Sequence, residues 1–295
     1  MKEKLKNILE SKVPFLLDSY RSMKNRRMFR RQFRDLHKRI RAHLYGNGEI
    51  KVLSGPFAGM FYIDEIVWGP ITPKWLGSYE AELDEVIDSI IDRGYTEIID
   101  VGCAEGYYAV GLAYRIGSAE IYAYDTDFIS RKQILRLAKI NNVQSRVHVS
   151  SYCSCEELER HGSTCGLIIC DVEGFERLLL DPEQSPVLSK IDILVEVHEG
   201  KWTPSTLDLL KQRFSPTHTL EEFHAKDRRE WVDSVKGNSA IFLEPALLTE
   251  AVNEHRSNGR EWLWMKAEES GWPGKDDIRS TPTRTPTCGS QRDTM

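Results

Sequence analysis

The chain has 295 residues, of which 40% are hydrophobic, so it is long enough to bury the core of one large domain. It contains no run of about 20 apolar residues and no uninterrupted apolar stretch near its start, which argues against a membrane span and a secretory signal. The formal net charge is −5, but residues 1–43 hold 14 Lys and Arg against four acidic residues. This segment therefore carries about +10 and the remainder about −15, which indicates a basic arm on an acidic domain.

The six cysteines do not form a metal-binding pattern. None belongs to a C-x-x-C pair, so the sequence does not indicate a structural zinc site. Several lie in apolar runs, where cysteine acts as a small buried hydrophobic residue. We therefore expect reduced cysteines and a cytoplasmic location.

Residues 2–45 have the pattern of a helix that is interrupted near Pro14 and ended by Gly46. A basic amphipathic helix of this kind docks on its own domain, on a second copy of the chain, on nucleic acid or on an anionic membrane surface. We treat residues 1–48 as a basic helical extension and leave these alternatives open, including a homo-oligomer. Its apolar stripe has spacings of three and four: Phe29, Phe33, Leu36, Ile40 and Leu44.

Residues 49–77 are rich in Gly, Pro and aromatic residues, which predicts short strands and turns that form a small lid before the main sheet. A helix is then expected from Ser78, with apolar residues at helical spacing and Gly94 at its end. The first turn of this helix carries Glu80, whose charge the helix dipole would favour.

The stretch 97–127 has the pattern of a nucleotide-binding half-sheet. A short apolar strand over 98–101 leads into a turn bounded by Gly102 and Gly106, and a helical segment follows. A second strand ends at Asp125, about twenty positions after the glycine turn. Glycine allows the backbone to approach a ligand at the helix start, and an acid after the second strand can hold both ribose hydroxyls.

The composition of the turn distinguishes between cofactors. A dinucleotide-binding turn reads G-x-G-x-x-G, whereas Ala104 stands here in place of the second glycine. Glu105 would also place a negative charge where phosphates lie. An acidic turn suits a cationic ligand without phosphates, so we predict S-adenosylmethionine and not NAD.

The residues from Asp100 to Gly106 resemble the first motif of class I S-adenosylmethionine-dependent methyltransferases. This resemblance implies a doubly wound, Rossmann-like α/β sheet of seven strands, with the last strand antiparallel to its neighbours. It also implies an acidic or aromatic residue near the methionine end of the cofactor (Tyr79 or Glu80) and the adenine beyond the third strand. The expected cofactor-binding residues are Glu80, Asp100, Gly102, Cys103, Ala104, Glu105, Gly106, Tyr107, Asp125, Thr126, Ser151, Tyr152 and Asp171.

Two later segments resemble the FkbM family of methyltransferases. A strand over 166–170 leads into the string DVEGFE, which begins at Asp171 and is similar to the fourth motif of that family. A strand from Asp192 ends in the acidic pair of residues around His198, which is also similar. The resemblance covers roughly residues 78–245, which we assign as the methyltransferase domain. It implies O-methylation of a sugar, glycan or natural product.

The ends of strands four and five carry the candidate catalytic groups. Methyl transfer to a hydroxyl needs a base or a metal to remove the proton of the acceptor. His198 has the intrinsic pKa of a base near neutrality, and Asp171 would orient the acceptor or the cofactor amine. The alternative is a Mg²⁺ or Mn²⁺ site formed by Asp171 with Glu196 or His198. We favour the metal-free base.

Other functional classes remain open. The acidic domain with a basic arm also fits a methyltransferase of RNA or protein that the arm guides to its substrate. A non-catalytic cofactor-binding module is a further alternative, although the glycine turn and the ribose acid are both present.

The C-terminal part is expected to form the last strand of the sheet, followed by a helical extension and a tail. Residues 238–243 have the pattern of the last strand, and residues 246–273 that of a helical extension. Residues 274–295 lack apolar periodicity and are rich in Ser, Thr, Pro and charged residues, which predicts a disordered tail.

Overall fold

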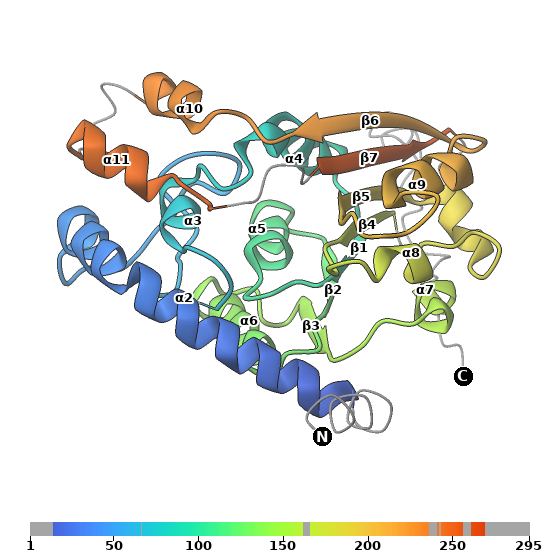
Figure 1. Ribbon diagram of the computed structural model, residues 1–295, viewed down its shortest axis with the longest axis horizontal. Coiled ribbons are helices and arrows are strands. Elements are labelled where there is room, and N and C mark those ends of the chain that lie inside the picture. Colours follow the sequence, from blue (N-terminus) through green and yellow to red (C-terminus); the bar gives the residue numbers. More distant parts are fainter. Residues whose placement is uncertain are drawn as a thin grey trace, which may run out of the picture.

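The computed structural model describes residues 14–65, 67–161, 166–235, 241, 243–255 and 261–268. These residues form a seven-stranded sheet with helices on both faces (Figure 1). The strand order is β3-β2-β1-β4-β5-β7-β6, so the predicted Rossmann-like α/β fold is confirmed. The strands are β1 (Glu97–Val101), β2 (Glu120–Tyr124), β3 (Val147–Ser150), β4 (Leu167–Cys170), β5 (Asp192–Val197), β6 (His218–His224) and β7 (Glu261–Ala267).

The first five strands are parallel to one another, and β7 pairs antiparallel with both β5 and β6. Strand order reverses between β1 and β4, because the chain proceeds from β1 toward β3 on one side and from β4 toward β5 on the other. In parallel sheets, ligands bind beyond the carboxyl ends of the strands at such a switch point. The topology therefore places a candidate site after Val101 and Cys170.

The sheet is buried on both faces, which gives two apolar cores. On β1, Ile98 belongs to one core and Ile99 to the other, as expected from the alternation of side chains along a strand. One core is covered by α2, α4, α5 and α6, and the other by α7, α8 and α9. The helices are α2 (Pro14–Tyr45), α3 (Thr72–Leu76), α4 (Asp84–Arg93), α5 (Tyr107–Arg115), α6 (Phe128–Ile140), α7 (Cys155–His161), α8 (Glu176–Leu179), α9 (Thr206–Phe214), α10 (Arg228–Ser234) and α11 (Pro245–Ala251), with short 3-10 helices η1 (Ala81–Leu83) and η2 (Pro186–Lys190).

The C-terminal prediction is wrong for its second half. Among the described residues of the predicted extension only α11 is helical, and Glu261–Ala267 forms β7 inside the sheet. Trp262 and Met265 are buried because β7 lies between two strands and is covered on both faces. Such a strand lacks the alternation of polar and apolar residues by which a strand is recognised in a sequence. Of the predicted last strand, Ile241 and Leu243 are not in a strand, and the other residues lie outside the described part. The predicted tail also lies outside it.

The start of one further helix differs from the prediction. The helix expected from Ser78 begins at Asp84, after η1, because Glu80 has a left-handed backbone (φ +52°) that interrupts helical geometry. Gly94 ends it as predicted, also with left-handed geometry. At the start of α10, the carboxylate of Asp227 accepts a hydrogen bond from the N–H of Arg229 (2.9 Å) and so caps the helix.

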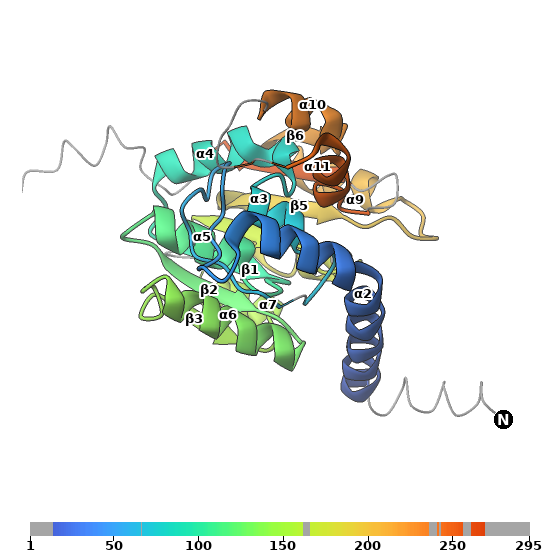
Figure 2. The ribbon, with the colours of Figure 1, turned by 90° about the vertical axis from the view of Figure 1, so that its left-hand side faces the viewer.

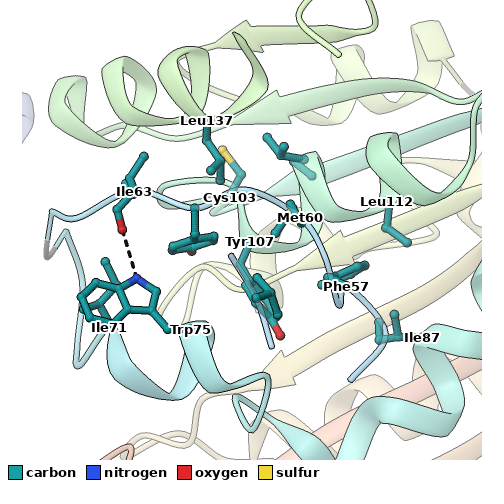
Figure 3. Packing of buried hydrophobic residues seen from close by; sticks show 14 of the residues in the cluster. Phe57, Met60, Ile63, Ile71, Trp75, Ile87, Cys103, Tyr107, Leu112 and Leu137 are labelled. Atoms are coloured by element: carbon teal, nitrogen blue, oxygen red, sulfur yellow. Dashed lines mark hydrogen bonds between the residues drawn. The ribbon is translucent and has the colours of Figure 1, made fainter. Parts of the chain in front are cut away.

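The segment 49–77 is built into the core. Lys51 and Phe61 form an isolated antiparallel bridge, and the residues between them turn back on themselves. Figure 3 shows Trp75 donating a hydrogen bond from Nε1 to the carbonyl of Ile63 (3.0 Å) beside the glycine turn. The largest fully buried side chains of this segment are Phe57, Met60, Ile63, Trp75 and Leu76. This segment therefore forms one wall beside the carboxyl ends of the strands.

The helix α2 docks on its own domain. Phe33, Leu36 and Ile40 are buried, and the exposed face carries Arg and Lys. Figure 2 shows that its N-terminal part extends beyond the domain. In the described part of the chain, no helix is long and apolar enough to cross a membrane.

This docking predicts a large contribution of α2 to stability. Ile40 is fully buried, so Ile40→Ala should lower the free energy of unfolding by about 2–4 kcal/mol, measured by urea denaturation. The neighbouring Arg39 is exposed, and Arg39→Ala should change it by less than about 0.5 kcal/mol. Equal stability of the Ile40→Ala variant and the native chain would show that α2 does not stay docked in solution.

Candidate functional site

A hollow lies at the switch point between β1 and β4. Its lining comes from the ends of both strands, from the glycine turn, from the start of α5 and from the segment before η1. The lining residues are Lys74, Tyr79, Asp100, Gly102, Cys103, Ala104, Tyr107, Tyr108, Ile169 and Asp171. Four of these residues were not among the predicted cofactor-binding residues: Tyr79 was given only as an alternative to Glu80, and Lys74, Tyr108 and Ile169 were not identified. The other six were predicted: Asp100, Gly102, Cys103, Ala104, Tyr107 and Asp171.

The glycine turn has the geometry that its sequence predicts. Gly102 has a φ of +84°, and a Cβ there would lie 1.7 Å from the carbonyl oxygen of Asp171. Any larger residue would therefore push the turn after β1 away from the end of β4. Ala104 also has a left-handed backbone, and Gly106 (φ +96°) leads into α5.

Asp125 holds this turn from the end of β2. Its carboxylate accepts hydrogen bonds from the N–H groups of Ala104 (2.8 Å) and Asp127 (2.7 Å). The carboxylate is partly exposed beside the turn, and the adjacent Thr126 is exposed. A role of Asp125 in ribose binding stays a prediction, with the geometry that such a role needs.

Glu105 does not place its charge on the ligand side of the turn, contrary to the prediction. Its side chain is buried beneath the turn, where it forms an ion pair with Lys74 and accepts a hydrogen bond from the hydroxyl of Tyr62 (2.9 Å). Its charge is therefore offset by Lys74, and Glu105 does not line the hollow. The pairing could not be predicted because the two residues are 31 positions apart and Lys74 lies within an apolar segment.

Lys74 is a site residue that the sequence analysis missed. It is buried in α3, with Nζ 4.7 Å from the ring centroid of Tyr79, and both residues line the hollow. A lysine side chain is rarely buried unless it is paired with an acidic group or has a role in binding or catalysis. Its position in the apolar stretch ITPKWLG was the available signal.

Asp100 supplies a buried carboxylate at the end of β1. Burial raises its pKa to about 7, the nearby Asp125 acts in the same direction, and the N–H of Ala109 opposes them. Its Oδ2 has no hydrogen-bond partner among the described residues. A buried acceptor of this kind attracts a cationic or hydrogen-bond-donating ligand.

Besides Glu105, six predicted cofactor residues lie outside the lining of the hollow: Glu80, Gly106, Asp125, Thr126, Ser151 and Tyr152. Glu80 is buried behind it, where it accepts a hydrogen bond from the hydroxyl of Tyr108, so of the predicted pair Tyr79 faces the hollow. Ser151 and Tyr152 are exposed beyond β3, and the ring centroid of Tyr152 lies 5.9 Å from that of Phe175. Their predicted contact with the adenine stays a prediction.

The ends of β4 and β5 bring His198 among carboxylates. Its Nε2 lies 3.3 Å from Oε2 of Glu196 and 3.6 Å from Oδ1 of Asp171 and Oε2 of Glu173. Burial acts to lower the pKa of His198, but the carboxylates of Glu176, Glu196 and Asp171 outweigh it and raise the pKa to about 10. Burial and the adjacent Glu196 carboxylate raise the pKa of Asp171 well above its usual range. An imidazole in this setting keeps its proton at neutral pH, which works against a metal-free base.

The fold and the site define a Rossmann-like α/β protein with a ligand hollow at its topological switch point. No family model matches the sequence. A ribosomal protein L11 methyltransferase of Lactococcus lactis subsp. lactis (strain IL1403) is 32% identical over 68 residues, which are 23% of this chain. The match spans only 21% of the length of that curated relative.

Solved structures similar to this chain have low sequence identity to it. A putative O-methyltransferase from Klebsiella pneumoniae is 11% identical, with 65% of this chain and 82% of that chain covered and a TM-score of 0.43. A putative rRNA-methylase from Clostridium thermocellum is 12% identical, with coverages of 64% and 97% and a TM-score of 0.43. A SAM-dependent methyltransferase from Geobacter sulfurreducens, in complex with S-adenosyl-L-homocysteine, is 14% identical, with coverages of 63% and 90% and a TM-score of 0.39.

The buried pair of Lys74 and Glu105 yields a stability prediction. Glu105→Gln leaves a buried ammonium without its counterion and should lower the free energy of unfolding by about 3–5 kcal/mol, measured by urea denaturation. The double variant Lys74→Met with Glu105→Gln removes both charges and keeps an acceptor for Tyr62, so it should recover most of that loss. A loss below about 1 kcal/mol for Glu105→Gln alone would show that the pair is not buried in solution.

Proposed function

We propose that this protein is an S-adenosylmethionine-dependent methyltransferase that methylates a hydroxyl of a sugar, glycan or natural product. The observation that carries the proposal is the hollow between β1 and β4, where a glycine turn lies beside the buried carboxylate of Asp100. This combination offers close backbone approach and negative charge to a cationic nucleoside. The hydroxyl acceptor follows from the resemblance of the DVEGFE segment to FkbM proteins.

The hollow and the adjacent end of β2 together offer a partner for each polar part of the cofactor. Asp100 would face the cationic methionine end, and Asp125 would receive the ribose hydroxyls at the end of β2. Lys74 and Tyr79 line the same hollow, so we assign the cofactor carboxylate to the Lys74 side. The glycine turn would lie against the nucleoside, where a side chain at position 102 has no room.

The reaction is an in-line displacement at the sulfonium methyl group. The acceptor oxygen forms a bond to the methyl carbon as the carbon–sulfur bond breaks, which leaves S-adenosylhomocysteine and releases the proton of the acceptor. Asp171 lines the hollow, and Nε2 of His198 lies 3.6 Å from Oδ1 of Asp171. We therefore assign the acceptor to the part of the hollow beside Asp171. This placement requires the two partners to approach from opposite sides of the transferred methyl group.

A methyltransferase of RNA or protein is the second candidate. The exposed face of the docked part of α2 carries Arg31, Arg34, Lys38 and Arg39, which would attract an anionic substrate. Salt-sensitive binding of RNA that is lost when these four residues are changed to Gln would favour this candidate over a small-molecule acceptor.

The cofactor assignment is tested by calorimetry. S-adenosylhomocysteine should bind with micromolar affinity, and NAD should not bind. Asp125→Ala should weaken binding by about 1–3 kcal/mol, because the ribose hydroxyls and the N–H of Ala104 lose their acceptor. Asp88→Asn, which changes an exposed acid on α4, is the matched control and should bind like the native chain. Tight NAD binding would refute the assignment.

The raised pKa of Asp100 gives a pH dependence with a definite sign. Its ionised form attracts the cationic cofactor, and below its pKa of about 7 binding must first remove a proton. Affinity for S-adenosylmethionine should therefore rise with pH, by roughly tenfold between pH 6 and 8. Asp100→Asn should bind more weakly at pH 8 and lose most of this rise. A native profile parallel to that of the variant would contradict the assignment.

A further inference from the structure

The ends of β4 and β5 bring one imidazole and two carboxylates together. Asp171 follows β4, Glu196 lies near the end of β5, and His198 follows β5. One donor atom from each of these residues lies within 4.8 Å of the others. We propose that Asp171, Glu196 and His198 bind a divalent transition-metal cation of the Mn²⁺ type at the acceptor end of the hollow.

The donor spacing is close to that of neighbouring ligands on one cation. Nε2 of His198 is 3.3 Å from Glu196 and 3.6 Å from Asp171, which is longer than a hydrogen bond between an imidazole and a carboxylate. Neighbouring ligands of an octahedral ion with bonds of roughly 2.1 Å lie about 3.0 Å apart. Shifts of a few tenths of an ångström would therefore bring Nε2 of His198 to this spacing from each of the two carboxylates.

The ring of His198 lies among these carboxylates without a hydrogen bond to any of them. The side chain is nine-tenths buried (10% exposed), and neither ring nitrogen has a hydrogen-bond partner among the described residues. Four carboxylates face the ring at 3.3–3.6 Å, those of Asp171, Glu173, Glu176 and Glu196. A dication would give a ring nitrogen of His198 a partner by coordination, and it would offset the negative charge of the carboxylates.

The backbone that carries the donors is fixed. Glu176 is fully buried, and its two oxygens accept hydrogen bonds from the N–H of Gly174 and the N–H of His198 (2.8 Å each). One side chain thus connects the loop after β4 to the residue after β5. Thr206 adds a hydrogen bond from its hydroxyl to the carbonyl of His198 (2.8 Å). Such supporting contacts hold the donors of a metal site in position.

The donor set indicates which ions would bind. Carboxylate oxygens suit Mg²⁺, Ca²⁺ and Mn²⁺, whereas an imidazole favours transition metals, so the mixed set favours Mn²⁺ over Mg²⁺ and Ca²⁺. Three protein ligands leave coordination positions open, and Asp171 borders the hollow. If the proposed function holds, a bound ion there would acidify the acceptor hydroxyl, a role that rests on that function.

The test is calorimetric titration of the chelator-treated full chain with MnCl₂, with the loss of the free Mn²⁺ EPR signal as a second measurement. The native chain should bind one equivalent. Glu196→Gln, Asp171→Asn and His198→Ala should each weaken binding by at least about 100-fold. His148→Ala is the matched control, because His148 also contacts a carboxylate, Glu120 (2.7 Å), but at an exposed site on β3. It should bind Mn²⁺ like the native chain.

The result that overturns the proposal is the absence of saturable Mn²⁺ binding, or binding that Glu196→Gln and Asp171→Asn leave unchanged. The cluster would then be an ion-pair network around a protonated imidazole. Thermal unfolding identifies any variant that fails to fold, and the two amide variants keep the size of the native side chains. Binding of S-adenosylhomocysteine to the metal-free chain tests the proposed function separately, so either idea can fail alone.

Discussion

The close approach of the turn after β1 to the end of β4 is the constraint on which the site depends. The carbonyl oxygen of Asp171 occupies the space where a Cβ at position 102 would be, so only glycine allows the two segments to meet. Because β1 and β4 are parallel and aligned, this contact also brings Asp100 and Asp171 to the same edge of the sheet. The hollow lies where the strand order reverses, and α5 begins directly beside it.

Around this edge the protein buries more charge than a core usually contains. Lys74 and Glu105 neutralise each other beneath the turn, whereas Asp100 holds a carboxylate whose pKa burial raises to about 7. A second group of carboxylates surrounds His198. Buried charges without a compensating partner lower stability, so natural proteins retain them mainly where a ligand completes them. Asp100 and Asp171 both line the hollow, so each of the two groups of charge contributes a carboxylate to the same candidate ligand site.

The peripheral segments also shape this edge. The residues from Lys51 to Leu76 are packed into the core, and they deliver Lys74 to the hollow from a position far from the strand ends in sequence. The helix α2 lies on the same side of the sheet through Phe33, Leu36 and Ile40. Docking uses the apolar stripe and leaves the Arg and Lys face exposed, so stability and recruitment of an anionic partner are compatible roles for one helix.

The sequence by itself determined the elements that local chemistry specifies. The order β1, glycine turn, α5, β2 follows from apolar runs and from glycines that must adopt a left-handed backbone, and Asp125 could be placed because it directly follows a strand. Only the tertiary structure decided the rest. β7 became a strand because β5 and β6 cover its edges, although Trp262 and Met265 show no alternation. Glu105 acquired Lys74 as a partner, and His198 acquired the carboxylate of Glu176 from α8 in addition to those at the ends of β4 and β5. A local pattern does not contain these neighbours, and the charge state of a buried group depends on them.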